Sequence, residues 1–186
     1  MPANLASFFA YIINALASLY LLVLLLRFWL PWLRADFRNP MAQGILKLTS
    51  PAVVPLRRVL PSFGRLDTAT LVVAFAVQYL TILVMLLIYG VTASFSAIAI
   101  TALVKLGLLT INLFLFAILI RVVLSWVAAG QHNPATAIIT TLTEPVLRPF
   151  RRLIPAIGGF DLSPIFAMIL LGASTRLLMG FNPLGM

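Results

Sequence analysis

The sequence predicts an all-α integral membrane protein with four transmembrane helices, arranged as two tandem repeats of the same orientation. Hydrophobic residues make up 62% of the chain and charged residues only 9%, whereas an average soluble domain is about one quarter charged. Four apolar stretches each approach or exceed the roughly 18–20 residues that a membrane helix needs. The two halves of the chain also align with each other without a gap.

The four predicted spans run from about Leu5 to Leu33, from about Thr68 to Tyr89, from about Ala97 to Ala129 and from about Leu162 to Met179. The first span is too long, and too poor in preceding positive charge, to resemble a cleaved signal peptide, so we expect it to be retained. Gly90 opens a short Ser/Thr-containing connection between the second and third spans. These two spans should therefore form a tight hairpin.

Positive charge is concentrated in the two longer connections. Segments 34–66 and 129–160 carry nine of the 13 Lys and Arg residues, whereas residues 1–7, 90–96 and 181–186 carry none. Because positively charged loops stay on the cytoplasmic side, both long connections should be cytoplasmic and both termini outside. The expected location is the inner (plasma) membrane, crossed several times.

An internal duplication divides the chain into predicted repeats at residues 1–94 and 95–186. Residues 19–67 align with residues 113–161, and many matched residues are of types that an apolar composition would not supply. These pairs are Arg27/Arg121, Trp32/Trp126, Asn39/Asn133, Pro40/Pro134, Thr49/Thr143, Pro51/Pro145, Pro55/Pro149, Arg57/Arg151, Arg58/Arg152, Pro61/Pro155, Gly64/Gly158 and Asp67/Asp161. Since each repeat holds two spans, both copies should enter the membrane in the same direction, around a pseudo-twofold axis along its normal.

Each long connection is predicted to contain two short amphipathic helices at the membrane surface. The Asn-Pro pairs at 39–40 and 133–134 indicate helix starts, because asparagine accepts a hydrogen bond from a free backbone N–H and proline suits the first helical position. Pro51 and Pro145 predict a second start, since proline disfavours helix in the residue before it. Prolines at 55, 61, 149 and 155 then bracket each second element.

Twin arginines lie inside those bracketed elements, at Arg57-Arg58 and Arg151-Arg152. An apolar residue flanks each pair, which suits a segment whose apolar side chains dip into the membrane while the guanidinium groups stay among phosphates. Two interpretations remain open. The arginines contact anionic headgroups or a protein partner specifically, or they only fix the topology.

The pattern NPxxxxIxxLTxPxxxPxRRxxPxxGxxD, present twice between membrane spans, resembles the signature of the YGGT family of small integral membrane proteins. The copies differ where Ser50 stands in the first and Glu144 in the second. The resemblance implies association with osmotic-shock resistance in proteobacteria, with cell-division gene neighbourhoods in Gram-positive bacteria, and with cytochrome maturation or nucleoid organisation in plastids. It supplies no catalytic residue.

Charged residues near the predicted span ends suggest ion pairs. Arg27 and Arg121 lie toward the ends of the first and third spans, and Asp67 and Asp161 precede the second and fourth. A half-buried arginine needs an anion, so we hypothesise the pairs Arg27–Asp67 and Arg121–Asp161. The alternative is that the aspartates cap helices while the arginines reach toward the headgroups.

Lys105 interrupts the third span, and Asn112 follows two helical turns later. Polar residues inside spans are costly and often functional, so these two side chains would contribute to a polar path. Alternatively, Lys105 extends to the outer surface of a tilted helix and the amide makes an interhelical hydrogen bond.

The composition narrows the function classes. The chain has no cysteine and one histidine, so thiolate sites and multi-histidine metal sites within the chain are excluded and no cofactor is expected. No phosphate-binding glycine loop or serine-hydrolase motif is present, so we expect no enzyme. So apolar a chain could not fold as a soluble reader of bases, so we expect the net charge of +9 to face anionic lipid headgroups and no direct nucleic-acid contact. We favour a membrane scaffold or assembly factor that presents basic elements to anionic lipid, a membrane protein partner or a second copy. The alternative is a small ion channel or transport component, acting as an oligomer.

Overall fold

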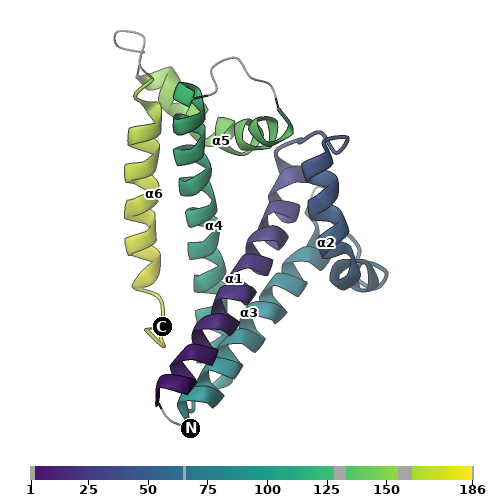
Figure 1. Cartoon of the computed structure of the whole chain (residues 1–186), viewed down its shortest axis with the longest axis vertical. Helices are drawn as coiled ribbons and strands as arrows, with labels where there is room; N and C mark the ends of the chain where they lie inside the picture. The colour runs from purple at the N-terminus through teal and green to yellow at the C-terminus, as the bar shows by residue number, and fades with distance from the viewer. Residues whose placement is uncertain (1–2, 65, 128–132, 155–160, 186) are drawn as a thin grey trace.

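The structure, a computed structural model, describes residues 3–64, 66–127, 133–154 and 161–185. Within these residues the chain is helical, as the sequence predicts. Six helices follow one another: α1 (Ala3–Trp32), α2 (Pro40–Arg57), α3 (Thr68–Tyr89), α4 (Phe95–Val127), α5 (Pro134–Leu153) and α6 (Ser163–Met179). Figure 1 shows α1 packed beside α3 and α4 packed beside α6, with α2 and α5 attached toward the end of the molecule opposite the termini.

Three helices are long and apolar enough to cross a membrane, by length and composition: α1 over Asn4–Trp32, α3 and α4. The fourth predicted span corresponds to α6, an apolar helix of 17 residues that is shorter than these. The protein is therefore a membrane protein with several apolar helices. The predicted hairpin between α3 and α4 turns at Gly90, whose φ of 65° is in the left-handed region that glycine adopts without strain.

Each long connection contains one continuous helix where two short ones were predicted, which corrects that prediction. Helix α2 runs through Pro51 and Pro55, and α5 runs through Pro145 and Pro149. Proline removes one backbone hydrogen bond and disfavours helix before it, but this preference is overcome when one face of the helix is buried on both sides of the proline. In α2 that face includes Thr49 and Val53, both fully buried.

Both loop helices begin at the Asn-Pro pairs. The Asn39 side chain accepts a hydrogen bond from the Met41 backbone N–H at 2.8 Å, and the Asn133 side chain accepts one from Thr136 at 2.8 Å. The side chains thus replace helical partners that the first turn lacks.

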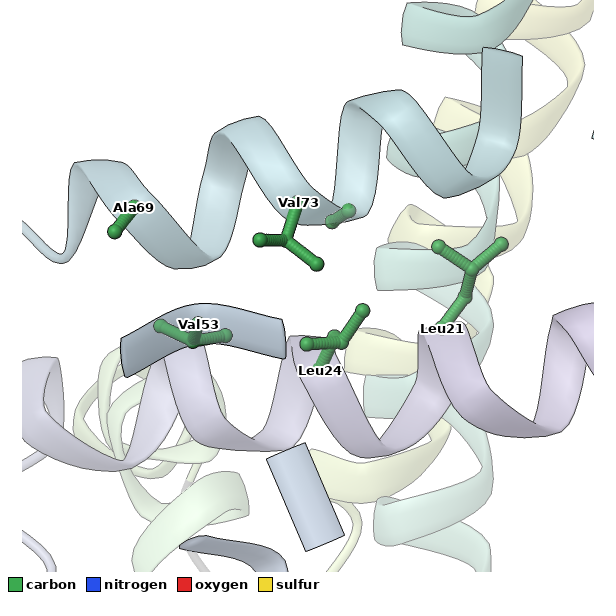
Figure 2. Packing of buried hydrophobic residues seen from close by; sticks show 6 residues of the cluster. Leu21, Leu24, Val53, Ala69 and Val73 are labelled. Carbon is green, nitrogen blue, oxygen red and sulfur yellow. The ribbon is translucent and has the colours of Figure 1, made fainter. Parts of the chain in front are cut away.

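Helix α2 packs into the first repeat through an apolar core. Val53 of α2 lies with Leu21 and Leu24 of α1 and with Ala69 and Val73 of α3 (Figure 2). Loss of this buried face would expose apolar surface worth about 1.5–3 kcal/mol for each large side chain.

The two repeats meet along the α3–α4 hairpin and also through their loop helices. One apolar cluster joins four helices, with Leu30 from α1, Ala42 from α2, Ala117 from α4 and Leu142 from α5. Nearby, the Asn39 side-chain amide donates a 2.7 Å hydrogen bond to the Pro134 carbonyl. The start of each loop helix is therefore in contact with the other repeat.

Candidate functional site

Two related charged clusters lie where each loop helix meets the long helices of its own repeat. In the first cluster, Arg27 Nη1 donates a 2.8 Å hydrogen bond to Thr49 Oγ1. In the second, Arg121 Nη1 donates a 2.8 Å hydrogen bond to Thr143 Oγ1. Each threonine hydroxyl donates in turn to the carbonyl four residues earlier in its helix, and so has lone pairs left to accept from arginine.

In the first cluster Asp67 is the acidic centre. Its Oδ2 lies 3.7 Å from Arg27 Nε, accepts a 2.7 Å hydrogen bond from Thr70 Oγ1 and accepts another from Arg57 Nη2. The hypothesised Arg27–Asp67 partners are thus within ion-pair distance. Asp67 also caps α3, because Oδ1 accepts from the Thr70 backbone N–H at 3.3 Å. Both sequence interpretations of this aspartate apply together.

Arg27 is enclosed by protein, with a side chain only 3% exposed. Besides Thr49, its Nη1 donates to Ser50 Oγ at 3.2 Å and to the Leu46 carbonyl at 3.3 Å. These neutral acceptors supplement the single carboxylate of the cluster. A buried guanidinium group needs such partners, because an uncompensated buried charge is strongly destabilising.

The second cluster has a different pairing from the one hypothesised. Arg121 Nη2 lies 2.9 Å from Glu144 Oε2, and it is Arg151 whose Nε lies 2.8 Å from Asp161 Oδ2. Arg151 Nη1 also reaches Glu144 Oε2 at 2.9 Å. Within the described residues, no ion pair joins Arg121 to Asp161. The reason is Glu144, which follows Thr143 on α5 and supplies a nearer carboxylate, whereas Ser50 at the equivalent place in the first repeat has none.

The acids of both clusters are held ionised by their neighbours. Burial alone would raise the pKa of Asp67, but hydrogen bonds from Thr70 and Arg57 outweigh it and lower the pKa below the usual value. A hydrogen bond from Arg121 lowers the pKa of Glu144 in the same way. Hydrogen bonds from Ser163 and Arg151 lower the pKa of Asp161. Burial opposes the charge of Arg151, yet its bond to Asp161 raises its pKa.

The two clusters differ in their access to the surroundings. The Asp67 side chain is 6% exposed, whereas that of Asp161 is 39% exposed. Beside the second cluster is a cavity of about 620 Å³, bounded by residues of α4, α5 and α6. Position 122, which lines this cavity, is valine; its equivalent in the first repeat is Phe28, a larger and buried side chain.

The twin arginines divide into two roles. Arg57 and Arg151 bind the acids of their own repeats, whereas Arg58 and Arg152 are exposed and form no ion pair with any described residue. Arg148, one turn before Arg152 on α5, is also exposed. It lines a second hollow of about 500 Å³ together with Arg152, Leu153 and two of the motif prolines.

The other predicted residues lie outside these clusters. Lys105 and Asn112 are partly buried in α4, and in the part of the chain that the structure describes neither forms a hydrogen bond or an ion pair. The Pro61 carbonyl accepts a 2.8 Å hydrogen bond from Thr68 Oγ1, which ties the end of the loop to the start of α3. Pro155 lies outside the described residues.

Sequence reasoning missed the threonines and the acid at position 144 as parts of the clusters. The identity of Thr49 with Thr143 across the repeats was a usable signal. A buried arginine with a single acid in reach also requires further acceptors, and hydroxyl side chains one helix away are the available ones.

This arrangement, repeated in both halves of the chain, agrees with comparison to known proteins. The chain matches the CCB3/YggT family twice, over residues 6–88 and over residues 100–182. It belongs to the CCB3/YggT family. The two matched segments each contain one complete charged cluster.

Several relatives cover most of the chain. A protein of Pseudomonas aeruginosa is 45% identical over 163 residues, which cover 87% of this chain and 83% of the relative. Protein YggT of Escherichia coli strain K12 is 39% identical over 162 residues, covering 87% and 84%. A chloroplast YlmG homologue of Arabidopsis thaliana is 38% identical over 68 residues, covering 35% of this chain and 26% of that protein. No solved structure matches the chain.

Proposed function

We propose that this CCB3/YggT family member is a non-enzymatic scaffold of the inner membrane, with a basic surface that binds anionic lipid headgroups. In this proposal α1, α3, α4 and α6 all span the membrane, both termini lie outside, and the loop helices α2 and α5 lie at the cytoplasmic face. The observation that carries the proposal is that the arginines at positions 58, 148 and 152 are each exposed and that none of them is ion-paired with a described residue.

Exposed apolar side chains next to these arginines support contact with a membrane surface. Val59 follows Arg58 and is 80% exposed, and Leu153 follows Arg152 and is 79% exposed. These two apolar residues are equivalent in the two repeats. An exposed apolar side chain beside an exposed cation is typical of elements that insert shallowly between headgroups.

The three exposed arginines would give a measurable affinity for an anionic membrane leaflet. Each cation close to an anionic leaflet contributes about 1 kcal/mol, so three exposed arginines would contribute about 3 kcal/mol together. The attraction falls off beyond the Debye length, about 8 Å at physiological salt, so the arginines must lie near the phosphates. Position at the membrane surface is thus a requirement of the proposal.

The composition of the lipids that are extracted together with the protein tests this proposal. The triple variant Arg58→Gln/Arg148→Gln/Arg152→Gln and the native protein are extracted with their surrounding lipid in polymer-bounded discs, and the anionic lipid fraction is measured. The native protein should be enriched in anionic lipid relative to the whole membrane, and the triple variant should lose this enrichment. Arg176→Gln, in the last turn of α6, is the matched control and should retain it. Equal enrichment in the triple variant would refute the proposal.

A protein partner or a second copy of the chain is the other occupant that this surface would suit. A photo-crosslinking amino acid in place of Arg152 should give lipid adducts, and the same substitution at Arg176 provides the comparison. A discrete protein adduct found only from position 152 would point to a partner instead. Osmotic-stress resistance and cell-envelope or division processes are the roles we propose for this surface. Survival of osmotic shock by cells carrying only the triple variant tests the first of these roles.

A further inference from the structure

The cavity beside the second cluster has the size of a ligand site. It measures about 620 Å³ and is bounded by α4, α5 and α6, which lie together in Figure 1. Cavities of about 300–1,000 Å³ are usual for small-molecule sites. It is separate from the exposed arginines of the proposed function, none of which lines it.

The cavity wall combines a compact charged region with a larger apolar one. The charged side chains are Arg121, Arg151 and Asp161. The apolar lining consists of Val122, Trp126, Leu147, Leu162, Pro164, Ile165 and Met168. Glu144, which joins the two arginines, is not part of the lining. The cavity therefore faces two guanidinium groups and one carboxylate, and the Glu144 carboxylate, bound to both arginines outside the lining, balances the remaining positive charge.

Both arginines keep donors for a further acceptor. Arg121 uses Nη1 for Thr143 and Nη2 for Glu144, while Arg151 uses Nε for Asp161 and Nη1 for Glu144. Each guanidinium has five N–H donors in a planar fork. Arg121 Nε and Arg151 Nη2 thus have no acceptor among the described residues. Glu144 accepts hydrogen bonds from both guanidinium groups and so fixes their positions. An oxyanion that binds them would therefore not have to immobilise either side chain.

We propose that this cavity binds one membrane phospholipid, with the phosphodiester at Arg121 and Arg151 and the glycerol and first acyl carbons along the apolar wall. A phosphodiester presents two free oxygens, which match the unused N–H donors of the two arginines. The predominance of apolar lining favours a lipid over free phosphate, since free phosphate would leave most of the wall in contact with water.

The position of Arg121 along α4 fits a phospholipid ligand. Arg121 lies six residues before Val127, where α4 ends, a rise of about 9 Å at 1.5 Å per residue. A helix long enough to cross a membrane thus carries the arginine near one end, at the depth of the headgroups. Trp126, on the same wall, is 73% exposed, and tryptophan is enriched at this interface.

The first repeat suggests the variant that tests the site. There, the position of Val122 holds Phe28, which is buried, and the acid of the cluster is enclosed. Val122→Phe should fill the cavity with the side chain that the other repeat tolerates, and it leaves every charge unchanged. Val123→Phe is the matched control, because residue 123 is exposed and does not line the cavity.

Native mass spectrometry of the detergent-purified full chain, with phosphatidylglycerol as the probe, measures the binding. The native protein and Val123→Phe should each retain one tightly bound lipid, and Val122→Phe should bind it at least about tenfold more weakly, because the phenyl ring occupies the space that the lipid needs. Diacylglycerol, which lacks the phosphodiester, should bind about tenfold more weakly to the native protein. Arg121→Gln should weaken phosphatidylglycerol but not diacylglycerol. Thermal unfolding of each variant reports whether it is folded.

Three results would overturn the inference. One is equal phosphatidylglycerol binding by folded Val122→Phe and the native protein, and another is equal binding of diacylglycerol and phosphatidylglycerol. The third is displacement of the lipid by glycerol phosphate at a similar concentration, which would mean a site for a soluble phosphate. None of these depends on the exposed arginines, so failure here leaves the surface-binding proposal standing, and failure of the triple variant leaves the cavity site standing.

Discussion

Replacement of Asp67 by asparagine should destabilise the protein far more than the equivalent replacement of Asp161. Asparagine keeps the size of the side chain and one carbonyl oxygen, so the hydrogen bond from Thr70 can persist. What is lost is the negative charge beside Arg27. That guanidinium group is only 3% exposed and has one carboxylate within ion-pair distance among the described residues.

The magnitude follows from burial. Removing one partner of a buried ion pair costs about 3–5 kcal/mol, because it leaves a buried charge without compensation. In the second cluster Asp161 is 39% exposed and its partner Arg151 is 34% exposed. Solvent screens such a pair, and exposed pairs are worth about 0.2–1 kcal/mol. Arg151 also keeps Glu144 as a partner in Asp161→Asn.

Equilibrium unfolding in mixed micelles, followed by circular dichroism as the fraction of denaturing detergent rises, measures both variants. A double-mutant cycle with Arg27→Gln isolates the pair, since the cost of Asp67→Asn should shrink by more than about 1 kcal/mol when the arginine is already absent. Equal costs for Asp67→Asn and Asp161→Asn would refute the reasoning from burial. Additive effects of Arg27→Gln and Asp67→Asn would refute the pairing itself.

Three further predictions concern pH, helix packing and transport. The pKa of Asp67 in the folded protein is lowered from its usual value of 3.8. The ionised carboxylate therefore contributes stability that is fully present above the usual pKa and is lost as the pH falls through the lower folded pKa. The unfolding midpoint should decrease below about pH 4, and it should decrease less steeply with pH in Asp67→Asn. Gly107→Leu should destabilise the protein by about 1–3 kcal/mol by overpacking, since its Cβ would already lie 2.7 Å from Leu178 Cδ2 and the rest of the leucine would have to displace that side chain. Gly172→Leu, whose Cβ would have no atom within 4 Å outside its own stretch of helix, should cost less in the same assay. Proteoliposomes of the native protein should show no potassium or proton flux above empty liposomes, and a flux that Lys105→Ala alters would support the channel alternative.

The helical fold and the starts of the loop helices were predictable because they depend on local chemistry. An apolar run long enough to cross a membrane forms a helix there, because a helix satisfies the backbone N–H and C=O groups within the segment itself. The Asn-Pro pairs specify a cap and a first turn from two neighbouring residues, and the structure shows Asn39 and Asn133 in that role.

The continuity of α2 and α5 and the pairing of the second cluster depend on tertiary contacts, and so the sequence could not supply them. The proline rule describes an isolated helix, whereas Thr49 and Val53 are buried against neighbouring helices. The partner of Arg121 was decided by Glu144, whose distance to it depends on how α5 packs on α4. The alignment of repeats suggested symmetric pairs, and one substitution, Ser50 against Glu144, broke that symmetry.

The hydrogen bond from Asn39 to the Pro134 carbonyl can form only late in the synthesis of the chain. The start of α2 emerges from the ribosome long before α5 exists, so its last partner arrives only after more than half of the chain has been made. Until then the apolar side chains of Leu30 and Ala42 lack the α5 surface that covers them in the complete protein. A first half made alone would present this uncovered surface, and separately made halves should find one another through it.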